Sequence, residues 1–341
     1  MNMQLNTKRP SWRGRSVERT LDLVLQGSGA HGAFGWGILD KLLEDGHIDV
    51  GGIAATGTGA MNGAVYAYGN MTGGKAQARE LLETFWRKAS ERVSWGHTLR
   101  RSPLEHMFAA VEPISRHWFE QIIYMLSPNE LNPLNFDPMR TILEMVVDFG
   151  ELRRCKTTRL SITATNVRTG LPCTFVMPQI TVDAVLASAC QPTISQAVEI
   201  DGEYYWDGVY SGMPNLVSAP TGADGHDILI GQINPIRRRN LPRRTADIQD
   251  RINEITVHNA FAHEIGALAV TGPGKDSNMR QPSVSDGSSI RVHTICSNDV
   301  ISDQFISSKF DTSWRFLTRL RDAGRLATEL WLETNLDKHG I

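Results

Sequence analysis

The sequence predicts an α/β fold with a mainly parallel central sheet, and three observations support this prediction. A short apolar run at residues 21–25 ends in glycines, as a buried parallel strand does. A second apolar run at residues 50–55 also leads into a glycine turn. Helical patterns of apolar residues follow both turns, at 34–43 and 60–68. Strand, glycine turn and helix, twice in close succession, are typical of βαβ units.

The remaining chain alternates between helical and strand-like segments. Helices are expected at 75–93, 116–126, 139–147 and 182–189, and strands at 160–166, 173–176, 197–200, 204–206 and 227–233. After residue 233 the pattern is largely helical, apart from a stretch at 272–289 rich in Gly, Pro and Ser that is typical of a mobile loop. We therefore expect a basic N-terminal tail over 1–20, an α/β domain over 21–215, and a C-terminal extension over 216–341 that adds one strand and then helices.

The composition and charge of the chain exclude several classes of protein. The chain has 341 residues, 41% of them hydrophobic and 21% charged, which is ordinary for a globular protein. Its formal charge of -2 gives no reason to expect nucleic acid as a partner. No apolar run approaches the roughly 18 residues of a membrane span, and the basic tail lacks the apolar core of a secretory signal. Four widely spaced cysteines favour reduced thiols and a cytoplasmic location over a disulfide framework.

The first glycine turn, Gly27–Gly32, fits the G-x-G-x-x-G fingerprint of dinucleotide-binding proteins. That fingerprint requires an acidic residue at the end of the second strand. Here the second strand ends in apolar residues, and Asp49 lies at its beginning. Two other interpretations remain. The backbone N–H groups at the start of a helix could stabilise an anion that forms during a reaction, or the loop could be a tight turn without a ligand.

The second glycine turn lies where a hydrolase would have its nucleophile elbow. In such an elbow a serine within G-x-S-x-G occupies a strained strand-to-helix turn, and its hydroxyl is exposed. The turn reads Ala55-Thr56-Gly57-Thr58-Gly59-Ala60-Met61-Asn62 and contains no serine. The chain has no serine between Ser28 and Ser90, so no shift of the motif supplies one.

Together these motifs resemble the patatin-like phospholipase family. Its members carry a glycine-rich oxyanion loop, a G-T-S-x-G-A-x-N-A elbow, and a later Asp-Gly turn whose aspartate forms a dyad with the elbow serine. The corresponding segments here are residues 27–32, residues 55–62 with matches at Thr56, Gly59, Ala60 and Asn62, and Trp206-Asp207-Gly208. Residues 163–166 and 187–192 also look like family segments, so the resemblance covers about residues 21–215.

The resemblance implies a three-layer α/β/α fold, a lipid or acyl-ester substrate, and neither a cofactor nor a metal. It implies an oxyanion loop made of Gly27, Ser28, Gly29, Ala30, His31 and Gly32, an elbow with Thr56, Thr58 and Gly59, and Asp207 as the dyad partner. The nucleophile position holds Gly57. Other departures are Ser28 and Ala55 in place of glycines, His31 in place of Arg or Lys, and Val209 in place of a small residue.

We therefore expect a lipid acyl hydrolase scaffold that is inactive or crippled, because no acyl-enzyme forms without the serine oxygen. In a comparable hydrolase, loss of the nucleophile costs about 10⁶ in kcat. Glycine also avoids the strain of a serine in the elbow, about 1–3 kcal/mol, so Gly57 is expected to keep or raise stability. The alternatives are a non-catalytic lipid-binding or regulatory pseudoenzyme, and a hydrolase with another nucleophile. Thr58 is next in line, but one step along a helix turns a side chain by about 100°.

Three other features have simpler interpretations. An aspartate that precedes a glycine, as Asp207 does, commonly forms a turn. The arginines at 237–239, 243 and 244 are typical of a solvated loop, or would give peripheral contact with anionic lipid headgroups. His263-Glu264 resembles part of a zinc-binding helix, but Ala267 stands where the second histidine is required, so we expect no metal. The oligomeric state stays open.

Overall fold

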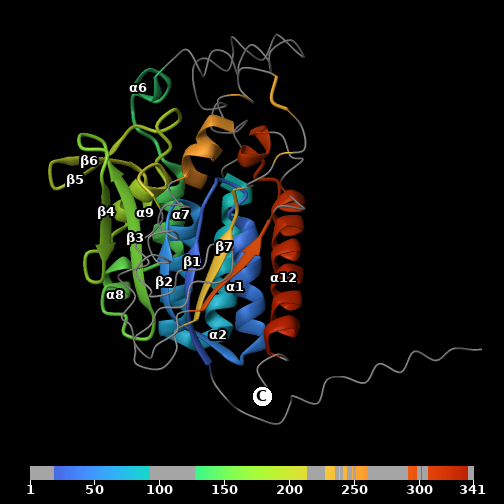
Figure 1. The fold of residues 1–341 in the computed structure, drawn as a ribbon. Helices are drawn as coiled ribbons and strands as arrows, with labels where there is room; N and C mark the ends of the chain where they lie inside the picture. Colours follow the sequence, from blue (N-terminus) through green and yellow to red (C-terminus); the bar gives the residue numbers. More distant parts are fainter. Residues whose placement is uncertain are drawn as a thin grey trace, which may run out of the picture.

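In the computed structural model one sheet carries a layer of helices (Figure 1). The structure describes residues 19–92, 127–212, 227–234, 238, 241–243, 248, 251–259, 291–297, 301 and 306–336. The N-terminal tail up to residue 18, the helix expected at 116–126 and the loop expected at 272–289 lie outside these residues.

The sheet has eight strands and is mainly parallel, as predicted. The strands are β1 (Arg19–Leu25), β2 (Ile48–Ala55), β3 (Arg159–Asn166), β4 (Pro172–Val176), β5 (Val198–Ile200), β6 (Glu203–Asp207), β7 (Asp227–Gln232) and β8 (Arg291–Cys296). Their order is β5-β6-β3-β2-β1-β7-β8, with β4 also paired to β3. The five strands from β3 to β8 along this order are parallel, whereas β4, β5 and β6 pair in antiparallel fashion.

The helices form a continuous layer in the order α12, α1, α2, α7 and α9. The helical elements are α1 (Ala33–Asp45), α2 (Thr58–Arg92), α6 (Pro128–Leu131), α7 (Pro138–Val146), α8 (Phe149–Leu152), α9 (Val182–Ser188), α12 (Trp314–Leu336) and the short 3-10 helices η1 (Gly208–Tyr210) and η3 (Ile306–Phe310). The helices expected at 60–68 and 75–93 are the two arms of α2, which is interrupted at Gly73 and Gly74.

The C-terminal extension completes the sheet and the helical layer. β7 pairs with β1, and β8 pairs with β7. β8 was missed from the sequence, where a largely helical pattern was expected after residue 233. Its six residues, RVHTIC, form a short edge strand with only one fully buried position, so the apolar signal is weak. The division at about residue 215 therefore separates two parts of the chain that share one sheet.

Helix α12 packs closely on α1 through two glycines. A Cβ atom on Gly37 would overlap the carbonyl oxygen of Arg321, and one on Gly324 would overlap that of Phe34. Beside this crossing, Trp36 lies in the core with its ring centroid 6.2 Å from that of Trp86. A larger side chain at either glycine would push the helices apart.

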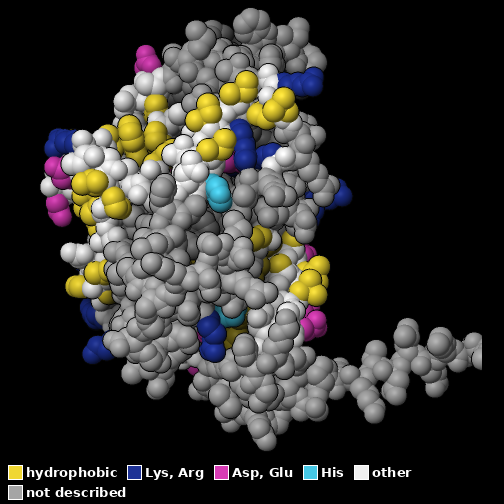
Figure 2. Space-filling view, viewed as in Figure 1, with side chains coloured by type: hydrophobic (Ala, Val, Ile, Leu, Met, Phe, Trp, Pro, Cys, Tyr) yellow, Lys and Arg dark blue, Asp and Glu magenta, His cyan; other side chains and the backbone are white. Residues whose placement is uncertain are grey.

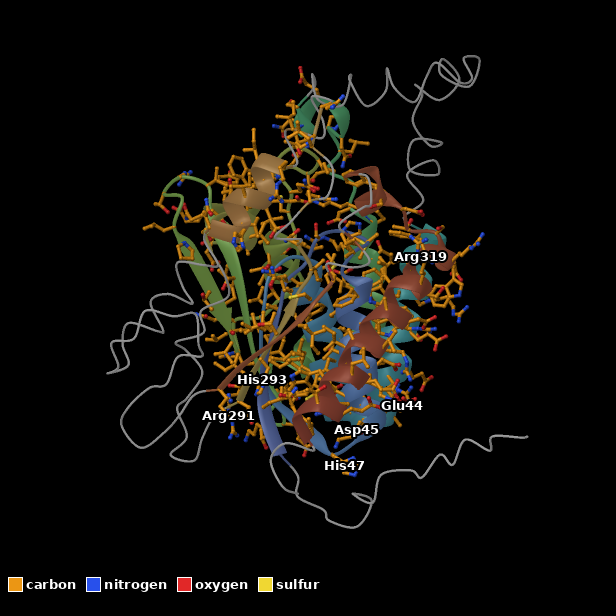
Figure 3. The ribbon with its side chains drawn as sticks, turned by 45° about the vertical axis from the view of Figure 1, so that its right-hand side comes forward. Glu44, Asp45, His47, Arg291, His293 and Arg319 are labelled. Atoms are coloured by element: carbon orange, nitrogen blue, oxygen red, sulfur yellow. The ribbon has the colours of Figure 1, made fainter. Side chains whose placement is uncertain are left out.

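Charged side chains cluster at the end of the molecule where the parallel strands begin. Figure 3 shows Glu44, Asp45 and His47 there, near Arg291 and His293 of β8, whereas Arg319 lies toward the other end of α12. Burial would raise the pKa of the Asp227 carboxyl, but His293, whose Nε2 lies 3.6 Å away, and Arg291, whose Nε donates at 2.6 Å, hold that pKa well below its usual range. This end is opposite to the one where the glycine turns lie.

Candidate active site

Three motifs meet at the carboxyl ends of β1, β2 and β3. Leu25, the last residue of β1, is paired with Ala55, the last residue of β2. Ala55 is in turn paired with Ile162 of β3, and two residues further along β3 Ala164 faces Asp207. The register therefore brings the oxyanion loop, the elbow and the aspartate turn to one edge of the sheet.

The elbow has the backbone conformation that a nucleophile position requires. Gly57 has φ +59°, in the left-handed region that side chains rarely adopt. A Cβ atom there would lie 3.1 Å from Gly27 Cα and 3.2 Å from the Gly27 carbonyl carbon. The Gly57 N–H group donates to both oxygens of Ser188, at 3.0 Å and 3.1 Å. Any side chain at this position would therefore be strained and would press on the oxyanion loop.

Ser188 is the serine that the fold brings to Gly57, and the sequence analysis did not identify it as a site residue. It is fully buried, and its Oγ donates to the Thr163 carbonyl oxygen at 2.7 Å while accepting from Gly57. Both functions of the hydroxyl are used, which makes Ser188 a clamp between the elbow and β3. The pair is 131 residues apart in sequence, so no local pattern could reveal it.

Close backbone approach explains two further glycines. A Cβ atom on Gly27 would overlap the backbone nitrogen of Thr58 and lie 2.6 Å from the Gly57 carbonyl carbon. A Cβ atom on Gly208 would overlap the Thr163 carbonyl oxygen. The oxyanion loop and the aspartate turn thus both press directly on the elbow region.

The aspartate turn is fixed through its backbone and carries a carboxyl with an unusual pKa. The Asp207 carboxylate accepts from the Val209 N–H group at 3.1 Å, and the Asp207 carbonyl accepts from Thr165 Oγ1 at 2.8 Å. Asp207 therefore does form the turn, as its residue type predicts. Burial raises the pKa of Asp207 to about 7, although the Val209 N–H group and the charge of Lys309 both favour the carboxylate. Such a carboxyl is poised to exchange a proton near neutral pH.

Four N–H groups of the oxyanion loop donate to oxygens of the chain itself, and two of them, those of Ser28 and Ala30, donate to oxygens outside the loop. The Ser28 N–H group donates to Thr58 Oγ1 at 3.2 Å, and the Ala30 N–H group donates to the Lys309 carbonyl oxygen at 2.8 Å. Between them, Gly29 has φ +55°, and a Cβ atom on it would overlap the same Lys309 oxygen. No sequence pattern indicated Lys309, which reaches the loop from η3.

Thr58 and Asn62 connect the start of α2 to the loop. The Thr58 hydroxyl faces Ser28, and a Cβ atom on Gly32 would overlap it. The buried Asn62 side chain donates to the Gly32 carbonyl at 2.9 Å and accepts from Trp86 Nε1 at 2.9 Å. Thr58 therefore packs against the oxyanion loop, because its hydroxyl points at that loop.

His31 points into the protein and is neutral. It is 1% exposed, and its Nε2 lies 2.8 Å from Ser308 Oγ. Burial lowers the pKa of His31 to about 3, with further contributions from the charges of Lys309 and Arg238. At a position where the family usually has Arg or Lys, this chain therefore has an uncharged ring, and the nearby positive charges come from other elements.

Arg238 corrects one expectation from the sequence, because it is not part of a solvated loop. Its guanidinium pairs with Glu254, whose side chain is only 1% exposed, and also donates to the Ile301 carbonyl at 3.3 Å. A buried carboxylate needs such a partner, and this requirement draws the arginine inward. Arg243 is exposed, while residues 237, 239 and 244 lie outside the described residues.

The described residues provide neither an acidic residue placed to bind a ribose nor a group of side chains that could hold a metal ion. Asp49 lies at the start of β2 and pairs with Lys75 at 2.6 Å, far from the carboxyl edge that a ribose-binding acid would occupy. Within the described ranges no group of three His, Cys, Asp or Glu side chains could hold a metal ion, and His263 and Glu264 lie outside those ranges. No helix in the described part of the chain is both long and apolar enough to cross a bilayer.

Comparisons with solved structures return distant matches. One is VipD from Legionella pneumophila, at 14% identity over 93% of this chain and 67% of that chain, with a TM-score of 0.44. Another is human GIVD cytosolic phospholipase A2, at 15% identity over 93% and 58%, with a TM-score of 0.40. A third is the ExoU–SpcU complex of Pseudomonas aeruginosa, at 20% identity over 73% and 51%, with a TM-score of 0.30. This chain thus spans little more than half the length of the last two.

The comparison with curated proteins gives no match. The model of the patatin-like phospholipase family, in contrast, matches residues 23–219, which is more than half of the 341 residues. This range contains the oxyanion loop, the elbow and the aspartate turn, in the order that the sequence analysis identified. The chain belongs to the patatin-like phospholipase family.

Proposed function

We propose that this chain is a lipid acyl hydrolase scaffold that binds an acyl lipid or ester but does not turn it over, because Gly57 occupies the nucleophile position. One observation carries the proposal. Gly57 has the left-handed conformation of an elbow and lies against Gly27 of the oxyanion loop, at the edge of the sheet where Asp207 also lies. These backbone features support a nucleophile position at Gly57 that lacks its hydroxyl.

The neighbouring hydroxyls support the loss of turnover. Acyl transfer needs a nucleophile that a base can activate. The Ser188 hydroxyl is buried and both donates and accepts hydrogen bonds, and the Thr58 hydroxyl accepts from the oxyanion loop. Neither contacts Asp207 through a hydrogen bond in the described part of the structure. With no activated hydroxyl, Asp207 has no proton to accept from a nucleophile.

An exposed apolar surface favours contact with lipid, which is also what a non-catalytic lipid-binding protein would need. Exposed apolar side chains occur next to α6 and around the helix at 251–259, and they are Leu134, Phe136, Leu241, Ile248, Ile252 and Ile255. Figure 1 places both elements at the end of the sheet where the site lies, and Figure 2 shows hydrophobic side chains gathered at that end. Leu134 is 90% exposed and Leu241 is 78% exposed. We propose that this surface makes peripheral contact with a membrane.

Reversion of the nucleophile tests the catalytic half of the proposal. The wild type, Gly57→Ser and the matched variant Gly57→Ala would be treated with a fluorescent fluorophosphonate and assayed with a short-chain nitrophenyl ester. We expect labelling and ester hydrolysis only in Gly57→Ser. Labelling of the wild type would show that another nucleophile is active. A folded Gly57→Ser variant that stays unlabelled would instead favour the lipid-binding alternative.

Vesicle co-sedimentation tests the lipid-binding half. Wild type should bind vesicles of phosphatidylcholine with phosphatidylglycerol, and exchange of Leu241 for Gln should weaken binding, because the lost contact is apolar. Exchange of Leu326 for Gln is a matched control, since Leu326 is 56% exposed on α12, away from this surface. Equal binding by both variants would contradict the assigned surface.

A further inference from the structure

The short helix η3 lies directly against the oxyanion loop. Three contacts join them: the Ala30 N–H group donates to the Lys309 carbonyl at 2.8 Å, His31 Nε2 lies 2.8 Å from Ser308 Oγ, and Gly29 leaves no room for a side chain beside the Lys309 oxygen. Consecutive residues of the loop thus meet consecutive residues of η3. We call Ile306–Phe310 the closing segment.

The Lys309 carbonyl uses a donor of the loop that would be needed by an acyl ligand. An oxyanion hole works through backbone N–H groups about 2.7–3.1 Å from the oxygen that becomes negatively charged. The Ala30 N–H group already has such an oxygen at 2.8 Å. A peptide carbonyl and an ester carbonyl are acceptors of the same kind, so the two cannot share this one donor without weakening both bonds.

The charge of Lys309 connects the closing segment to the rest of the site. It favours the carboxylate form of Asp207, disfavours a proton on His31, and favours the carboxylate of Glu254. Glu254 belongs to the helix at 251–259, whose outer side carries the exposed Ile252 and Ile255. The charge of Lys309 therefore acts on the loop, on the aspartate turn and on the helix that carries part of the apolar surface.

We propose that the closing segment shuts the oxyanion loop by placing the Lys309 carbonyl where an acyl carbonyl would bind, so that it must leave before an acyl ligand can be held there. The inference rests on the proposed function, because it assumes that the loop is the place where an acyl oxygen binds. The His31–Ser308 bond holds the closed arrangement from the side chain, and the Ala30–Lys309 bond holds it from the backbone.

Hydrogen exchange on the ligand-free chain tests the closed state without reference to lipid. The Ala30 amide should be protected in the wild type, and Ser308→Ala should make its exchange roughly five-fold faster, as expected for loss of one hydrogen bond of about 1 kcal/mol. Ser313→Ala is the matched control, since Ser313 is exposed just beyond the segment. An unprotected Ala30 amide, or equal exchange in both variants, would overturn the proposal.

Fluorophosphonate labelling of Gly57→Ser then tests whether the segment leaves. The introduced hydroxyl gives its proton to the Asp207 carboxylate and its oxygen bonds to phosphorus, from which fluoride leaves; the phosphoryl oxygen is expected to occupy the loop. Exchange within 306–310 should rise after labelling, and adding Ser308→Ala should speed labelling several-fold. Full labelling with unchanged exchange in the segment would overturn the closing role. Absence of labelling would refute the proposed function alone, because the exchange of ligand-free Ser308→Ala still decides whether the segment is closed.

Discussion

The elbow and the oxyanion loop have departed from the family pattern in different ways. The elbow keeps its left-handed turn, its close packing and its buried clamp from Ser188, whereas the hydroxyl at position 57 is absent. The loop keeps most of its glycines, but the N–H groups of Ser28 and Ala30 already have partners outside the loop, in Thr58 and Lys309. One region has lost a reacting atom, whereas the other has its donors occupied.

The comparison indicates that the glycines of such a scaffold can be required for packing alone. Gly27 and Gly208 are required because backbones meet there, whether or not any chemistry follows. Two of the positions that differ from the family pattern, Gly57 and His31, are ones whose side chains would have carried the hydroxyl or the charge. Variants of the two regions should therefore separate effects on packing from effects on the reacting or charged side chains.

The largest effect is expected where the two regions touch. Gly27→Ala places a Cβ atom into the Thr58 nitrogen, and neither backbone can move without disturbing the paired ends of β1 and β2. We expect a loss of about 3 kcal/mol in the free energy of unfolding. Urea denaturation followed by tryptophan fluorescence measures it. A loss below about 1 kcal/mol would show that the two regions are not tightly coupled.

The pH dependence of stability should separate the aspartate turn from the loop. The raised pKa of Asp207 means that the folded chain binds more protons than the unfolded chain between about pH 4 and 7, so stability falls as pH rises through that window. The lowered pKa of His31 has the opposite effect, and stability rises with pH between about 3 and 6.5. In the wild type the two slopes oppose each other over the shared range.

Single variants should reveal each slope. Asp207→Asn should leave stability rising between pH 4.5 and 6.5, and His31→Gln should leave it falling, each by up to about 1.4 kcal/mol per pH unit. Urea midpoints measured across this range provide the test, with the double variant as the control for both groups. Parallel pH profiles in the two single variants would contradict the opposite shifts.

A smaller effect should distinguish the crowding of the elbow from its backbone conformation. Gly57 and Gly46 both have positive φ, at +59° and +77°, but a Cβ atom meets Gly27 at 3.1 Å in the first case and nothing within 4 Å in the second. Gly46→Ala should cost about 1 kcal/mol from conformation alone, and Gly57→Ala should cost about 1–2 kcal/mol more. Gly57→Ser should be no more stable than Gly57→Ala. A serine variant that melts above the wild type would contradict the strain argument.

The smallest effect is expected from the two hydroxyls that hold the regions in place. Ser188→Ala removes the two hydrogen bonds of the hydroxyl, with the Gly57 N–H group and the Thr163 carbonyl, but keeps the bond that the Ser188 carbonyl accepts from Gly57, so we expect a loss of about 1–2 kcal/mol. Ser308→Ala should cost a similar amount. Thermal melts compare the two directly. Only Ser308→Ala should also speed exchange at Ala30, and the same exchange effect from Ser188→Ala would show that the two regions move as one.

The sequence predicted the half of the site that is local in the chain. The strand-turn-helix units around residues 27–32 and 55–62 and the aspartate turn follow from short patterns of glycine and apolar residues, and β1, β2, α1 and the start of α2 were placed nearly to the residue. The family resemblance joined them in the right order.

The contacts that were not predicted join residues far apart in the chain. Ser188 reaches Gly57 across 131 residues, and Ser308 reaches His31 across 277. No sequence pattern around either serine indicates which residue it contacts. Arg238 was misread for the same reason, because its attraction to the buried Glu254 depends on a helix whose position the sequence does not show. Edge strand β8 was missed because its few buried positions leave almost no periodic signal.

The order of the strands has a consequence for how the chain is made. β1 and α1 are synthesised well before β7 and α12, yet one edge of β1 is covered by β7 and the outer face of α1 by α12. Until those late segments emerge, a central strand has an open edge, which can pair with other chains. A chain cut at residue 219, the end of the family match, should therefore aggregate. The sheet and helical layer that begin with β1 are completed only when α12 has been made, so the nascent chain must be shielded while the segments between them are translated.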